Sequence, residues 1–148
     1  MIETFIVALS LAGLVISLYF TFAYYGRVKK SRWIPEILCA REGSSCVTVV
    51  QTPYARVLGI PNSVLGIMYY LLVIPRALIG FDIPSRYEGG YQLVWPALFV
   101  LPASLATVLF GFYLIYALRR KLHINCPLCY TAHAINVVLL VLLLLLAR

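Results

Sequence analysis

Four long apolar stretches constrain the fold of this chain more than any other feature. Each is bounded by charged or turn-forming residues, and together they cover about residues 4–26, 61–81, 91–118 and 127–147. A helix rises about 1.5 Å per residue, so about 20 residues cross a hydrocarbon core of about 30 Å. Since 63% of the 148 residues are hydrophobic and 11% are charged, a water-soluble monomer of this size could not bury its apolar surface. The sequence therefore predicts an all-α integral membrane protein.

The connections between these stretches predict the architecture. Residues 82–90 and 119–125 form short loops, whereas the connection over residues 27–60 is far longer than usual. That long loop carries many apolar side chains, so we expect it to lie on the membrane surface and cap the helices. We predict a single membrane domain over residues 1–148, a bundle of four transmembrane helices with no thioredoxin-like domain fused to it.

All four cysteines are expected on one face of the membrane. Cys39 and Cys46 lie in the long loop between the first two helices, and Cys126 and Cys129 lie where the fourth helix begins. In a chain that crosses four times, the first and third connections are on the same side. The spacing along the chain therefore indicates two pairs of thiols at that face.

The segment Cys126-Pro127-Leu128-Cys129 is typical of a redox pair. Proline is favoured in the first turn of a helix, and a Cys-x-x-Cys at a helix start has lowered thiol pKa values. A zinc site of four thiolates is an alternative. The six-residue spacing of the loop pair and the lack of a well-placed histidine argue against it, so we predict no metal. Structural cysteines in a non-enzymatic membrane subunit or transporter are the other alternative.

Polar residues follow the cysteines along the fourth helix. Cys129, His133 and Asn136 are spaced i, i+4 and i+7, which places them on one stripe. Polar groups at membrane depth are costly and are functional candidates by default. We expect His133 near an oxidant and Asn136 in a hydrogen bond between helices. Asn62, at the start of the second helix, could equally cap that helix or donate to a ligand carbonyl.

The expected oxidant is a quinone. Two disulfide pairs near a membrane need a two-electron acceptor that lives in lipid, and the chain has neither a haem-type histidine pair nor a dinucleotide fingerprint. The formal net charge of +7 does not point to nucleic acid. The basic residues lie in short clusters between apolar runs, where they set orientation and contact anionic lipid headgroups.

Several segments together resemble the vitamin K epoxide reductase family of membrane thiol oxidoreductases. The matching segments are Cys39-(x6)-Cys46, Pro53-Tyr54-Ala55, Leu58 to Gly66 with its Pro-Asn-Ser-Val-Leu-Gly run, Cys126-Pro127-Leu128-Cys129, and Ala134-Ile135-Asn136. The resemblance implies a four-helix bundle around a quinone of the menaquinone or ubiquinone type, with a relay of thiol–disulfide exchanges.

The resemblance also implies a role for each cysteine. Cys126 and Cys129 match the membrane-level pair, with Cys129 nearest the quinone. Cys39 and Cys46 match the shuttle pair, in which Cys46 attacks Cys126 and Cys39 meets a partner. In the family that partner is a thioredoxin-like protein, which would act here in trans.

Two further residues are implied as quinone contacts. Asn62 matches the family's quinone-contacting asparagine. His133 stands where vertebrate members have a tyrosine that contacts the quinone, so this chain keeps a polar residue there but departs from the vertebrate pattern.

Basic residues predict the orientation of the chain in the cell membrane. Lys and Arg are enriched in cytoplasmic loops, and three of the twelve belong to the face without cysteines. The other nine belong to the cysteine face: Arg27, Lys29, Lys30, Arg32, Arg41, Arg56, Arg119, Arg120 and Lys121. The bias predicts a cytosolic cysteine face, an arrangement suited to hyperthermophiles, where intracellular disulfides are common. The alternative is the outward-facing arrangement usual in the family.

Overall fold

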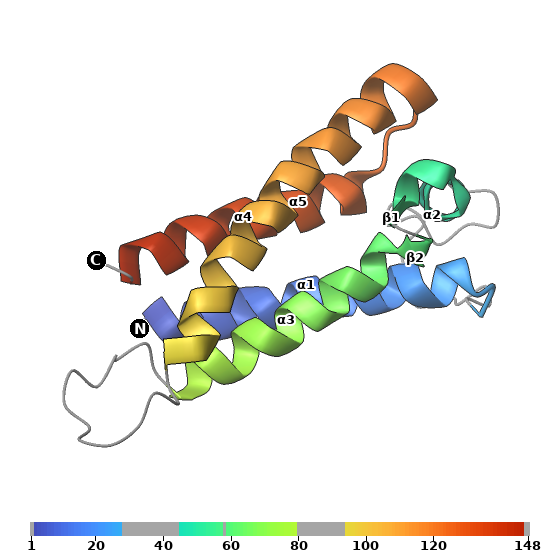
Figure 1. Cartoon of the computed structure of the whole chain (residues 1–148). Coiled ribbons are helices and arrows are strands. Elements are labelled where there is room, and N and C mark those ends of the chain that lie inside the picture. Colours follow the sequence, from blue (N-terminus) through green and yellow to red (C-terminus); the bar gives the residue numbers. More distant parts are fainter. Residues whose placement is uncertain (1, 28–44, 58, 80–93, 147–148) are drawn as a thin grey trace, which may run out of the picture.

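The computed structural model describes residues 2–27, 45–57, 59–79 and 94–146. Helices dominate these residues, and a small antiparallel hairpin joins two of them (Figure 1). The long helices are α1 (Ile2–Tyr24), α3 (Asn62–Ile79), α4 (Val94–Tyr116) and α5 (Pro127–Leu146). The shorter elements are α2 (Ser45–Gln51), a 3₁₀ turn (Pro53–Ala55), β1 (Arg56–Val57), β2 (Ile60–Pro61) and a π-helical turn (Ala117–Leu122).

Within the described ranges, three helices are long and apolar enough to cross a membrane. They are α1, α5 and the combined segment Phe99–Leu122, which joins α4 to its π-helical turn. The apolar part of α3, Asn62–Leu78, is shorter and contains Pro75 and Arg76. The prediction of a helical membrane protein is confirmed, while a fourth crossing by α3 stays a prediction.

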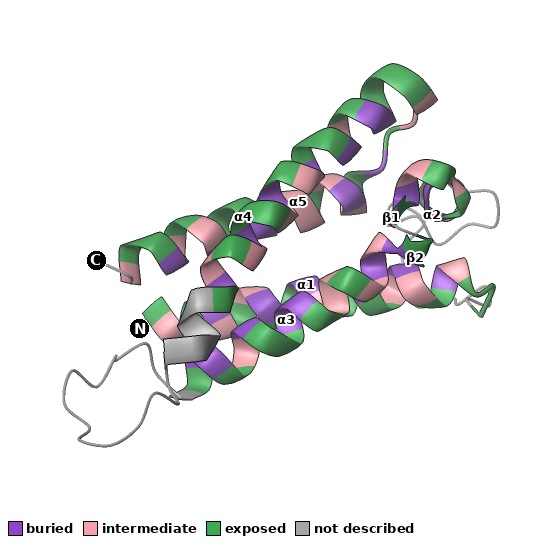
Figure 2. Ribbon diagram, in the orientation of Figure 1, coloured by how far each residue is buried: buried purple, intermediate pink, exposed green. Residues whose placement is uncertain are grey.

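The long helices pack as two pairs. In Figure 1, α1 and α3 lie side by side, and α4 crosses α5, which also contacts α1. Figure 2 shows that the buried faces turn toward neighbouring helices and that exposed residues cover the outside. Large apolar side chains such as Leu71, Leu109 and Phe112 are among those exposed. A lipid environment explains this apolar exterior, which a soluble protein of this size would not show.

Hydrogen bonds between side chains connect the helices in the interior. The Thr21 hydroxyl donates to Ser63 at 3.0 Å between α1 and α3. The Tyr70 hydroxyl donates to Asn136 Oδ1 at 2.7 Å between α3 and α5. This bond confirms the expectation that Asn136 bonds across helices.

The described part of the 27–60 connection is folded. Helix α2 packs on α1, and a hairpin follows in which Arg56 pairs with Pro61 and Val57 with Ile60. Gly59 in its turn has φ of 85°, a left-handed conformation that glycine adopts without the clash of a Cβ. The hairpin leads directly into α3 and so fixes the position of Asn62.

The connection between the π-helical turn that follows α4 and the start of α5 is shorter than the predicted loop over residues 119–125. The chain continues beyond α4 through the π-helical turn to Leu122, and His123 then adopts φ of 52°. Its backbone N–H still bonds to the Leu118 carbonyl. This left-handed residue ends the helical path and turns the chain toward Cys126.

Candidate functional site

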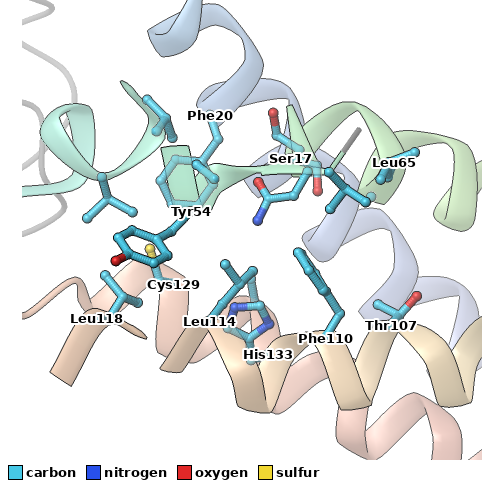
Figure 3. A pocket seen from close by; sticks show the side chains of 18 of the residues that line it. Ser17, Phe20, Tyr54, Leu65, Thr107, Phe110, Leu114, Leu118, Cys129 and His133 are labelled. Carbon is cyan, nitrogen blue, oxygen red and sulfur yellow. The ribbon is translucent and has the colours of Figure 1, made fainter. Parts of the chain in front are cut away.

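A cavity of about 380 Å³ lies at the end of the bundle where α5 begins. Ligand sites in proteins have volumes of about 300–1,000 Å³ and mostly apolar walls. Side chains from α1, α2, α3, α4 and α5 line it, and so do residues around the hairpin. The apolar walls include Phe20, Val49, Val50, Phe110 and Leu114. Figure 3 shows Tyr54 and Leu118 around the cysteine end of the cavity, with Phe110 and Thr107 toward the other end.

The two cysteines of the Cys-x-x-Cys segment lie at the start of α5, as predicted. Helix α5 begins at Pro127, and Cys126 and Cys129 are 0% and 7% exposed. The two thiols differ in what they face. Both cysteines pack in the buried cluster that includes Ala23 and Val49. Cys129 also lines the cavity, and Cys126 is not among the described residues that do.

The electrostatic setting of Cys126 favours its thiolate. A hydrogen bond from the Cys129 thiol holds the pKa of Cys126 below its ordinary value, and the backbone amides of Cys129 and Leu128 act in the same direction. Burial opposes them by disfavouring the charged form. Cys126 precedes Pro127, the first residue of the membrane span. It therefore lies at the helix start, where the free backbone N–H groups stabilise a thiolate, and not within the span.

A lowered pKa predicts that Cys126 reacts with alkylating agents at pH values where an ordinary thiol, of pKa about 8.5, is protonated. In protein carrying Cys39→Ser and Cys46→Ser, we expect the alkylation rate of reduced Cys126 to reach half its maximum below pH about 8.5. Cys129→Ala removes the donor, so it should move this midpoint upward. Mass spectrometry of the modified peptide measures the rate, and an unmoved midpoint would contradict the assigned cause.

The loop cysteines are only partly placed. Cys39 lies outside the described residues. Cys46 is described by its backbone, in the first turn of α2. The same short helix carries Val49 and Val50, which pack in the cluster that contains Cys126 and Cys129. The backbone of α2 therefore runs beside the Cys-x-x-Cys pair.

Both predicted polar contacts line the cavity. Asn62 is the first residue of α3, and His133 lies one turn along α5 from Cys129. His133 Nδ1 is buried and has no hydrogen-bond partner among the described residues. A buried polar group without a partner is costly, and His133 as a residue of the cavity wall is a candidate for a ligand contact.

Gly111 on α4 makes room for the His133 ring. A Cβ built at Gly111 would lie 2.7 Å from Nδ1 of His133, closer than real Cβ atoms approach. The absence of a side chain there allows α4 and α5 to pack with the ring between them.

Gly66 and Tyr70 line the cavity but were not predicted as site residues, although the sequence held a signal for them. Asn62, Gly66 and Tyr70 all line the cavity and are spaced i, i+4 and i+8 on α3, so they share one helix face. Tyr54, from the 3₁₀ turn, also lines the cavity. Nothing in the sequence indicated this beyond the place of Tyr54 in a segment that resembles the family. Its position depends on how the loop folds over the bundle.

A comparison with known protein families gives the class of the molecule. A family model described as the vitamin K epoxide reductase family matches residues 4–144, which include the described helices that line the cavity and both cysteine pairs. The match covers almost the whole chain. Members of this family are membrane oxidoreductases that act on thiols and quinones. This chain belongs to the vitamin K epoxide reductase family.

Proposed function

We propose that this protein oxidises the dithiol of a thioredoxin-like protein and reduces a membrane quinone of the menaquinone or ubiquinone type, so that it generates disulfide bonds. One observation carries the proposal. Cys129, a member of a vicinal thiol pair, lines an apolar-walled cavity inside a bundle of membrane helices. Family membership supplies the class of reaction.

The relay is a series of thiol–disulfide exchanges. The partner dithiol reduces the Cys39–Cys46 disulfide and becomes a disulfide itself. The Cys46 thiolate then attacks Cys126 in the Cys126–Cys129 disulfide, which forms a Cys46–Cys126 bond and releases Cys129 as a thiolate. Cys39 attacks Cys46 in turn, so the loop disulfide reforms and Cys126 leaves as a thiolate. A low pKa makes Cys126 a good leaving group in this step.

Quinone reduction completes the cycle. The Cys126–Cys129 disulfide reforms as two electrons and two protons pass to the quinone, which leaves as the hydroquinone. The apolar walls exclude water from the Cys129 sulfur. Asn62 and His133 supply polar groups that can donate to a carbonyl oxygen.

The test is quinone reduction by the purified protein. A reduced thioredoxin-like protein supplies the electrons, and the change in quinone absorbance follows the reaction. We expect catalytic turnover in which one donor disulfide forms for each quinone consumed. A membrane subunit with structural cysteines would neither oxidise the donor nor change the quinone spectrum.

Loss of either polar contact should weaken the reaction with quinone. A hydrogen bond to a buried group is worth about 1–3 kcal/mol, so His133→Leu and Asn62→Leu should each lower kcat/KM for the quinone by about 5- to 150-fold. Thr131→Val is the matched control, because Thr131 lies on α5 but is exposed, and its hydroxyl donates to the Pro127 carbonyl of the same helix start. Normal quinone kinetics in both cavity variants, with folding intact, would remove these residues from the site.

The room at Gly111 predicts a second kinetic effect. Overpacking a buried contact costs about 1–3 kcal/mol, so Gly111→Ala should raise the quinone KM by about 10-fold as the new methyl group displaces the His133 ring. Helix propensity favours alanine, which excludes a helix-breaking cause. In a His133→Ala background the same substitution should have no effect, and an equal effect in both backgrounds would contradict this account.

A further inference from the structure

The deep wall of the cavity contains a hydrogen bond whose members come from two helices. Tyr70 of α3 is 1% exposed, and its hydroxyl donates to Asn136 Oδ1 of α5 at 2.7 Å. Both side chains line the cavity. The bond therefore belongs to the cavity wall as well as to the bundle.

A third helix fixes the tyrosine. A Cβ built at Gly13 of α1 would overlap Cζ and the hydroxyl oxygen of Tyr70. The ring thus rests directly on the α1 backbone, where only glycine leaves room for it. With the ring held on one side and the Asn136 oxygen on the other, the Tyr70 hydroxyl has one direction in which to donate.

This bond orients the Asn136 amide. Its oxygen accepts from Tyr70, so the amide nitrogen, with two N–H donors, is the group left to serve the cavity. A donor facing an apolar cavity is stabilised when a carbonyl oxygen accepts from it. A quinone has two such oxygens, at opposite ends of its ring.

The spacing along α5 suits a ring that lies parallel to the helix. His133 and Asn136 are three residues apart, which separates their Cβ atoms by about 5–6 Å on one helix face. Cys129 precedes them on the same stripe. A quinone ring placed here would have one carbonyl near His133 and the other near Asn136.

We infer that Asn136, oriented by Tyr70, is a further hydrogen-bond donor to the quinone besides Asn62 and His133, and that Tyr70 is a positioning residue. The inference rests on the proposed function and adds the group that binds the carbonyl distant from Cys129. It also gives the Tyr70–Asn136 bond a role beyond holding α3 to α5.

The neighbouring tyrosine provides a matched control. Tyr69 is also buried on α3, and its hydroxyl makes a hydrogen bond of 2.9 Å with Ser104 of α4. Tyr69 is not among the residues that line the cavity. Tyr69→Phe and Tyr70→Phe therefore each remove one buried bond between helices, and only the second acts on the cavity.

The experiment measures quinone kinetics and thermal stability of the full chain with a reduced dithiol donor. We expect Asn136→Leu to raise the quinone KM by about 10-fold and Tyr70→Phe by about 3- to 10-fold, with kcat little changed. Tyr69→Phe should lower the melting temperature as much as Tyr70→Phe does, but leave KM unchanged. In the Asn136→Leu background, Tyr70→Phe should add nothing to KM.

Three results would overturn the inference. Equal changes of KM in the two tyrosine variants would mean that the bond acts only through stability. An unchanged KM in Asn136→Leu would mean that the amide does not contact the quinone. If the wild-type protein itself reduces no quinone, the proposed function fails and this inference fails with it. Normal wild-type turnover together with unchanged KM values in the variants rejects the inference alone.

Discussion

Replacement of Cys129 by serine should abolish quinone reduction, whichever dithiol supplies the electrons. Cys129 is the thiol of its pair that lines the cavity, and serine cannot form a disulfide with Cys126. Cys126→Ser should have the same effect for the same reason. Loss of a covalent catalytic group costs several orders of magnitude, so we expect a fall of at least about 10³-fold in kcat.

The loop cysteines provide the control for this result. Cys39→Ser and Cys46→Ser also replace a sulfur by an oxygen on the same expected face. In the proposed relay they interrupt only the transfer of electrons from the protein donor. With dithiothreitol as the donor, both variants should still reduce quinone, because a small dithiol can reach the Cys126–Cys129 disulfide directly. With a thioredoxin-like protein as the donor, both should be inactive. Full quinone reduction by Cys129→Ser would show that another group transfers the electrons.

Helices α1 and α5 could be predicted from local sequence, because each rests on a local cause. Apolar length predicted α1 and α5, and the Cys-Pro step predicted the first residue of α5, which the structure confirms. The crossing by α3 depends on more than length. Its apolar part is shortened by Pro75 and Arg76, and the arginine is 5% exposed, so what surrounds it decides whether it can lie at membrane depth.

The candidate site could be predicted where its residues share one helix. Cys129, His133 and Asn136 follow from their spacing on α5, and all three line the cavity. Gly111 could not be found in this way, since a glycine in an apolar helix does not indicate which ring packs against it. The same holds for Gly13, whose role depends on contact between α1 and α3.

The predicted orientation of the chain in the membrane depends on basic residues, and the exposure of some of them is given by the structure. Among the described basic residues of the cysteine end, Arg27, Arg56, Arg119, Arg120 and Lys121 are exposed. Arg76, one of the three basic residues assigned to the opposite face, is buried. Buried charge contributes little to a loop in water, so the asymmetry between the faces is greater than the count of nine against three in the sequence. Exposed Lys and Arg near helix ends stay on the cytoplasmic side.

We therefore propose that the cysteines face the cytosol and that both chain ends face outward, opposite to the usual arrangement in the family. Alkaline phosphatase fused after Arg148 should be active, because this enzyme folds only outside the cytosol, where its disulfides form. A cytosolic fluorescent reporter fused at the same position should be dark. Charge reversal of Arg119, Arg120 and Lys121 to glutamate provides the control, since removing three basic residues from the cysteine face should lower the phosphatase signal. An inactive phosphatase fusion together with a bright cytosolic reporter would place the cysteine pairs outside the cell membrane.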